Sequence, residues 1–224
     1  MKEILSFISE TLIAIPAALL VIIIHELAHG LMANALGDPT ARRMGRLTLN
    51  PIKHLDPIGA LCMVFFHFGW AKPVPIDPRY FKNPKLGMAL TALAGPLANL
   101  LFAFLCIPLV IPTLLGGAVL QSVGAMSFFV RFFDLLTEFI LIFHVMSIGL
   151  AVFNLIPIPP LDGSRVLFIF LPTKHYFGIM RYERYIAFAL VLFLAFGNRL
   201  GFLDVIERSI SGAMFAAWSW LPII

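Results

Sequence analysis

The feature that most constrains this chain is a His-Glu-x-x-His motif at the end of an uncharged apolar run. The motif consists of His25, Glu26 and His29, and residues 11–24 before it contain no charged side chain. Residues four apart lie on the same face of a helix, so His25 and His29 are predicted to present two imidazoles to one metal ion. Zinc accepts such ligands, and a glutamate beside them takes a proton from water at the metal.

A soluble amphipathic helix that carries this motif by chance is excluded by the absence of charge in residues 11–24. Ionisable groups at membrane depth are costly, and they indicate a functional site. His144 also lies deep within an apolar run. We expect it to be a hydrogen-bonded core histidine.

Composition places the chain in a bilayer. Of its 224 residues 60% are hydrophobic and 12% are charged, and the mean hydropathy is +0.96, whereas soluble domains carry about 25% charged residues. The net charge of +4 falls in junctions between apolar runs, which argues against nucleic-acid binding. Cys62 and Cys106 both lie in apolar runs and are expected to pack, not to form a disulfide or a zinc cluster.

The pattern of apolar runs predicts an all-α polytopic membrane protein with about five or six membrane segments. We expect one domain over 1–224, with a core at about 4–172 and further membrane segments at about 185–224. Three clear spans form the expected catalytic core, at 4–36, 86–111 and 128–156, and the weaker segments are 185–197 with 200–202, and 210–224. The uncharged stretch 112–127 is expected to connect two spans outside the cell.

A short element and a proline-rich loop follow the first span. Residues 58–70 are too few for an ordinary span, so they are expected to be re-entrant or half-embedded, with a thin, tilted crossing as the alternative. Prolines exclude helix from 71–76, which predicts an extended edge strand. The loops at 40–57 and 71–85 are basic, so the positive-inside rule places them and the metal site towards the cytoplasm, with the N-terminus outside.

Asp162 is the best-placed third metal ligand. It follows a long apolar stretch that the prolines at 157, 159 and 160 break, and irregular backbone at membrane depth is tolerated where it lines a cavity. A catalytic zinc site takes three protein ligands and keeps a fourth position for water. The alternative role for Asp162 is the N-cap of a helix over Gly163–Leu171, and the two roles are compatible.

The order of the motifs resembles the site-2 protease family of intramembrane zinc metalloproteases. The matching residues are His25-Glu26-x-x-His29, then Gly95-Pro96-x-x-Asn99, then Asn154-x-x-Pro157 leading to Leu161-Asp162-Gly163. Residues 47–51, 54–57 and 69–75 look like the small bacterial and archaeal branch, which carries no PDZ or CBS domain. The resemblance implies one zinc ion held by His25, His29 and Asp162, with Glu26 as the general base.

The same resemblance implies that Asn99 and Asn154 lie near the scissile bond and hold the substrate or polarise its carbonyl. Gly95 and Pro96, which suggest a close helix contact with a local break, take a supporting part. The family cuts transmembrane segments of other proteins. The implied partners are therefore the lipid bilayer and a transmembrane protein or peptide substrate. Without PDZ or CBS domains, substrate is expected to be selected either by the membrane domain itself or by a regulatory partner.

Three other functions remain open from the residues alone. A membrane metal transporter or metal-binding protein uses the same His and Asp residues, but it has no need of Glu26. A protease of the kind that trims prenylated proteins draws a Glu as third ligand, whereas here the candidate is Asp162. A degenerate family member that acts as a chaperone or binder is disfavoured by the intact motif.

Overall fold

The computed structural model describes residues 2–56, 59, 72–124, 126–172, 178–179, 181–196 and 201–220, and these residues are predominantly helical. The helices are α1 (Lys2–Ala35), α2 (Thr40–Arg43), α3 (Pro51–His54), η1 (Pro78–Tyr80), α5 (Pro84–Ser122), α6 (Ser127–Asn154), α7 (Asp162–Leu167), η2 (Phe168–Phe170), α9 (Glu183–Phe196) and α10 (Gly201–Ala217). No β-sheet occurs in this described part of the chain, which confirms the predicted helical class.

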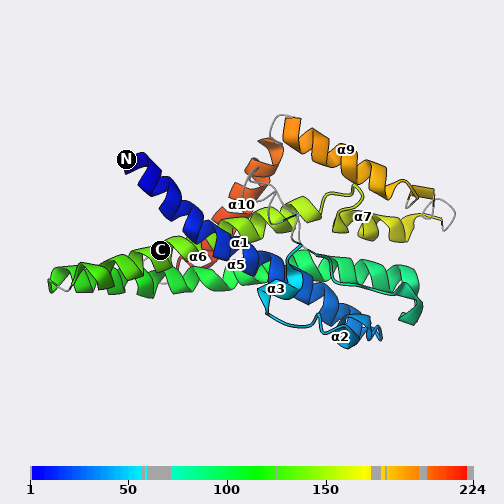
Figure 1. The fold of residues 1–224 in the computed structure, drawn as a ribbon, viewed down its shortest axis with the longest axis horizontal. Helices are drawn as coiled ribbons and strands as arrows, with labels where there is room; N and C mark the ends of the chain where they lie inside the picture. Colours follow the sequence, from blue (N-terminus) through cyan, green and yellow to red (C-terminus); the bar gives the residue numbers. More distant parts are fainter. Residues whose placement is uncertain are drawn as a thin grey trace.

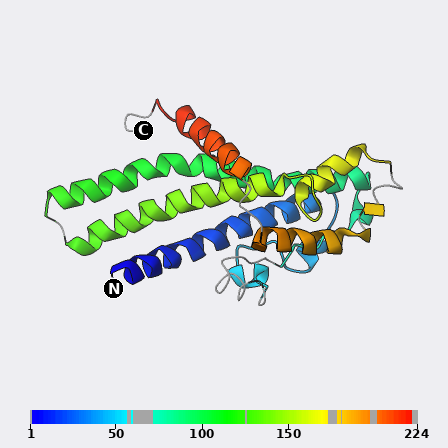
Figure 2. The same cartoon turned by 90° about the horizontal axis from the view of Figure 1, so that it is seen from above.

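Three long helices, α1, α5 and α6, lie side by side and form the body of the molecule (Figures 1 and 2). Among the described residues three segments are long and apolar enough to cross a membrane: Thr11–Ala35, Pro84–Ser122 and Ser127–Asn154. These are the three spans expected for the core. α9 and α10 have 14 and 17 residues, fewer than the about 20 that a membrane helix needs, so the larger number of segments stays a prediction.

The three long helices share an apolar core. It consists of Ala17, Val21 and Ile24 from α1, Cys106 and Val110 from α5, and Ile140 and Phe143 from α6. Small residues let the backbones approach, as is usual between membrane helices. Cys106 is buried in this core, as its apolar run predicted. A second cluster places Leu203 of α10 against Ala103 of α5 and Ile148 of α6.

The helix of the second predicted span does not end near Ile111, because α5 continues to Ser122 and includes most of the stretch 112–127. The external position of that stretch stays a prediction. The 39 residues of α5 extend about 58 Å at 1.5 Å per residue. Packing on α6 stabilises the added turns: Thr137 Oγ1 donates to Thr113 Oγ1 at 2.8 Å. A Cβ on Gly116 would lie 2.5 Å from the Phe133 ring. Hydropathy alone does not show such contacts.

Residues 72–77 form a segment without regular secondary structure between α3 and α5, so the expected edge strand is not confirmed in the described part of 71–76. The segment is fixed near both ends. The Lys72 N–H donates to His54 O at 2.8 Å, and Arg46 donates to Lys72 O at 2.6 Å. The wholly buried carboxylate of Asp38 accepts the Asp77 N–H at 2.7 Å. The expected short element at 58–70 lies outside the described residues except for Gly59.

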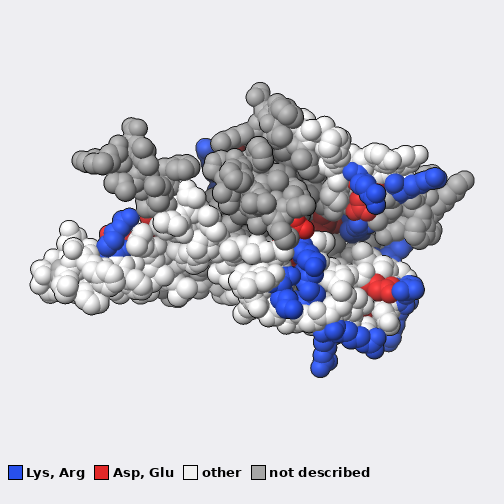
Figure 3. All heavy atoms as spheres, in the orientation of Figure 1, with Lys and Arg blue, Asp and Glu red and all other residues white. Residues whose placement is uncertain are grey.

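Charge is distributed unevenly along the molecule. In Figure 3, lysine and arginine side chains gather over the end that carries α2 and α3, whereas the limb formed by the far ends of α5 and α6 shows one small charged group on this face. This uneven distribution agrees with the basic loops from which the positive-inside rule predicted the orientation of the chain in the membrane.

Candidate active site

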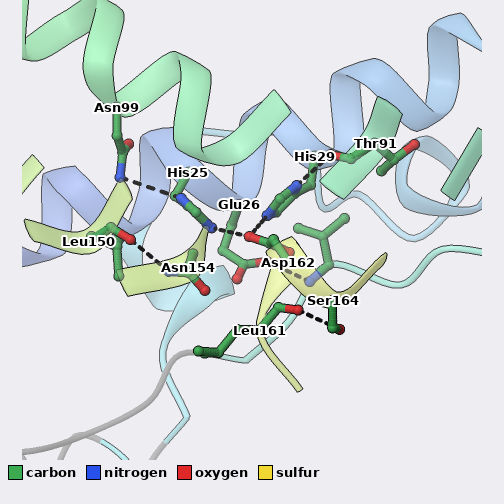
Figure 4. Close-up of polar contacts among 11 residues, drawn as sticks. His25, Glu26, His29, Thr91, Asn99, Leu150, Asn154, Leu161, Asp162 and Ser164 are labelled. Carbon is green, nitrogen blue, oxygen red and sulfur yellow. Dashed lines mark hydrogen bonds and ion pairs between the residues drawn. The ribbon is translucent and has the colours of Figure 1, made fainter. Parts of the chain in front are cut away.

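Two helices and a loop bring His25, His29 and Asp162 together (Figure 4). Asp162 Oδ2 lies 3.0 Å from His25 Nε2 and 3.3 Å from His29 Nε2, and the three potential ligand atoms are all within 4.8 Å of one another. Both histidines are buried, at 5% and 7% exposure. Two imidazoles and one carboxylate are a donor set that fits catalytic zinc, which keeps a further position open.

The loop after α6 carries Asp162 to the histidines. α6 ends at Asn154, and α7 begins at Asp162. Leu161 is the N-cap residue of α7 and no side chain caps the helix, so the alternative role of Asp162 as the N-cap is wrong. Its carboxylate is turned towards the two imidazoles instead.

Gly163 permits this turn, and its role was missed in the sequence. A Cβ at this position would lie 2.2 Å from Leu155 O and 2.7 Å from Ile156 O, both of which are backbone atoms. The loop and α7 therefore meet too closely for any side chain. The one available signal was that a glycine follows the candidate ligand directly.

Asp162 is held as a carboxylate. Burial favours the neutral carboxyl, but hydrogen bonds from His25 and His29 outweigh burial and lower the pKa of Asp162 to about 2. The side chain is therefore an anion at neutral pH, the form that coordinates a metal.

α5 forms the wall behind the two imidazoles. A Cβ on Gly95 would lie 2.5 Å from His29 Nε2 and 2.8 Å from His25 Cε1, so the absence of a side chain is what admits both rings. The close contact expected of the Gly95-Pro96 pair is therefore present, but the expected break is not, because α5 is a single helix through Pro96. The Thr91 carbonyl, which the sequence did not single out, lies 2.7 Å from His29 Nδ1.

Glu26 lies one residue beyond His25 and is held by the 72–77 segment. Its Oε2 accepts the Val74 N–H at 2.8 Å. This contact joins positions 48 residues apart and fixes one carboxylate oxygen. The segment that was expected to be an edge strand thus positions the candidate base.

A cavity of about 280 Å³ opens beside these groups. It is lined by His25, Glu26, His29, Pro73, Val74, Ile76, Met88, Ala92, Asn154, Pro160, Asp162 and Arg165. The two predicted asparagines differ: Asn154 lines the cavity and donates to Leu150 O at 2.9 Å. Asn99 is wholly buried behind His25, with its Nδ2 3.4 Å from His25 Nδ1.

Comparison with known families decides the classification. The model of Peptidase family M50 matches residues 13–197, which is most of the chain. The chain belongs to Peptidase family M50. This match confirms the resemblance to the site-2 proteases that the three ordered motifs indicated.

Two curated relatives of this M50 chain are named as metalloproteases. "Putative zinc metalloprotease YwhC" of Bacillus subtilis is 43% identical over 143 residues, which cover 64% of this chain and 62% of the relative. "Putative zinc metalloprotease Rip2" of Mycolicibacterium smegmatis is 26% identical over 169 residues, 73% of this chain and 59% of the relative. The matches thus span about three fifths of each relative's length. No solved structure matches the chain.

Proposed function

We propose that this M50 chain is a membrane-embedded zinc metalloprotease that hydrolyses a peptide bond in or near a transmembrane segment of another protein. The observation that carries the proposal is the convergence of His25 Nε2, His29 Nε2 and Asp162 Oδ2 beside a cavity that Glu26 also lines. When bound, zinc supplies Lewis acidity that polarises a peptide carbonyl and lowers the pKa of water.

Glu26 is the proposed general base. It takes a proton from the attacking water and delivers it to the departing amide nitrogen. One carboxylate oxygen is held by the Val74 N–H, which leaves the other oxygen for the water. A transporter has no use for such a carboxylate, and membership of a peptidase family also weighs against that alternative.

The substrate is proposed to enter the cavity as an unwound segment. Carbonyl groups of an intact transmembrane helix are hydrogen-bonded internally, so local unwinding must precede attack. Asn154 and the 72–77 segment line the cavity, and they are the proposed contacts for the extended substrate chain. The gathering of basic side chains at the α2–α3 end supports a cytoplasmic position for this cavity and an external N-terminus.

The experiment compares wild type, Glu26→Gln and Glu207→Gln in detergent for zinc content and for cleavage of a membrane-spanning test substrate. Glu207 is a half-buried carboxylate on α10 outside the cavity lining, so its amide variant is a matched control. We expect all three proteins to hold zinc and only Glu26→Gln to lose cleavage, by roughly 10²–10⁴-fold, the usual contribution of a general base. Equal cleavage by wild type and Glu26→Gln overturns the assignment of the base.

A further inference from the structure

The amide of Asn99 lies behind His25, on the side of the ring opposite Asp162 (Figure 4). Its Nδ2 is 3.4 Å from His25 Nδ1, while His25 Nε2 is 3.0 Å from Asp162 Oδ2. Asn99 is 0% exposed and is absent from the cavity lining. Its Oδ1 is buried and has no hydrogen-bond partner within the described part of the chain. Asn99 therefore faces a metal ligand and not the space that a substrate would fill.

The chemistry of imidazole decides which end of this amide suits a metal ligand. A neutral imidazole carries one proton, and the nitrogen that binds a metal must offer its lone pair. With His25 Nε2 at the metal, Nδ1 carries the proton and needs an acceptor. The NH₂ group of an amide is a donor only, whereas the amide oxygen accepts.

His29 already shows the arrangement that a metal requires. Its Nδ1 lies 2.7 Å from the Thr91 carbonyl, and a carbonyl can only accept, so Nδ1 donates. In the neutral form of the ring, which is the form that binds a metal, the lone pair is then on Nε2. Thr91 and Asn99 both belong to α5, about two helical turns apart. Helix α5 thus supplies the groups that face the Nδ1 atoms of both candidate ligands, His25 and His29.

We propose that Asn99 is the positioning residue for His25, with its Oδ1 accepting the Nδ1–H when zinc is held. The amide is then turned by half a revolution about its terminal bond from the orientation in Figure 4. In the arrangement of Figure 4, His25 Nε2 donates to Asp162 Oδ2 and Nδ1 accepts from Asn99 Nδ2. When zinc takes the place of the proton on Nε2, Nδ1 becomes the donor, and the turn gives it the buried Oδ1 as its acceptor. The inference deepens the proposed metal site and replaces the substrate contact that the family resemblance implied for Asn99.

The test measures zinc affinity of the detergent-solubilised full chain by competition with a chelator, and it needs no substrate. Asn99→Leu keeps the volume and removes the acceptor, whereas Asn99→Asp keeps an oxygen acceptor. Ile107→Ala, at a 1% exposed position on the same helix, controls for lost packing. We expect Asn99→Leu to weaken zinc binding by roughly 10–100-fold, the usual effect of losing such a partner, while Asn99→Asp and Ile107→Ala remain near wild type.

Kinetics and spectroscopy separate positioning from substrate contact. At saturating zinc Asn99→Leu is expected to keep the wild-type KM. In ¹⁵N NMR of zinc-loaded, histidine-labelled protein, the Nδ1–H of His25 is expected to be hydrogen-bonded and slow to exchange with water in wild type and Asn99→Asp, and to lose its hydrogen bond in Asn99→Leu. Unchanged zinc affinity with a raised KM in Asn99→Leu overturns the proposal in favour of substrate contact. Equal zinc loss in Asn99→Leu, Asn99→Asp and Ile107→Ala overturns it in favour of general packing.

The outcome for the protease function is read independently. If zinc affinity follows the expected order and no test substrate is cut, the role of Asn99 stands and the proposed hydrolysis fails. If wild type cuts substrate and Asn99→Leu keeps both its zinc affinity and the wild-type signal of the His25 Nδ1–H, the hydrolysis stands and the role of Asn99 fails. A wild-type chain that holds no zinc overturns both.

Discussion

The candidate metal ligands His25 and His29, like His144, are buried between long helices, yet the surroundings of these histidines differ. His144 is 2% exposed, and both of its ring nitrogens have neutral partners: Nδ1 lies 2.9 Å from Ala103 O, and Nε2 lies 2.9 Å from Ser211 Oγ. At His25 and His29 the Nδ1 atoms face α5, while both Nε2 atoms converge on the Asp162 carboxylate.

The difference shows how a structural histidine is told from a ligand in an apolar bundle. A ring whose two nitrogens meet a carbonyl and a hydroxyl completes its hydrogen bonds without a cation. Two imidazoles that converge on one carboxylate oxygen supply lone pairs and negative charge, a combination that is stable around a proton or a metal ion. His144, as the sequence suggested, is therefore a core residue, and it ties α10 to α5 and α6.

Removal of the Asp162 carboxylate, which both histidines contact, is expected to have the largest effect on zinc affinity. Asp162→Ala takes away one of three ligands, so zinc affinity should fall by more than the roughly 100-fold that changes outside the ligand set produce. Metal analysis of the purified proteins checks this, with His144→Ala as the matched histidine-site variant that should keep its zinc. Zinc retained in Asp162→Ala, or lost in His144→Ala, would reverse the assignment of the two regions.

A methyl group on the wall behind the imidazoles is expected to have the next largest effect. Gly95→Ala places a Cβ 2.5 Å from His29 Nε2, and displacement of the ring should weaken zinc binding by about 10–100-fold, as other orienting contacts do. Gly149→Ala is the control, because its Cβ would meet Glu207 Oε1 at 3.4 Å. Chelator competition measures both variants, and equal affinities would show that the ring position is adjustable.

The smallest effect, a change in the free energy of unfolding, is expected from variants at the contact between His144 and Ser211. Ser211→Ala removes one hydrogen bond, and such contacts between membrane helices average about 0.6 kcal/mol. Thermal unfolding of Ser211→Ala, His144→Ala and the double variant gives the coupling free energy between the two side chains. A coupling of zero would mean that the contact at 2.9 Å does not stabilise the docking of α10, and zinc content should not change in any of the three.

Local periodicity made much of the fold predictable. Three apolar runs predicted the three long helices, because hydropathy over about 20 residues depends only on nearby sequence. The extent of α5 was not predictable in this way. Its last turns to Ser122 depend on Thr113 meeting Thr137 and on Gly116 admitting Phe133, and both contacts come from the neighbouring helix.

The sequence by itself determined which groups are available for chemistry. His25 and His29 share a helix face because they are four residues apart, and Glu26 lies next to His25 on the same helix. Asp162 was named as the third ligand from its place after the prolines, but the contact with His25 joins positions 137 residues apart. The loop reaches the histidines only because Gly163 allows backbone to meet backbone.

Tertiary structure alone decided what two similar residues do. Asn99 and Asn154 both stand in apolar helices within recognisable motifs, yet one is buried against His25 and the other lines the cavity. Only the packing also revealed that the Val74 N–H holds Glu26. The physical reason is that a helical period is set by neighbouring residues, whereas the direction a polar side chain faces is set by which distant helix packs beside it.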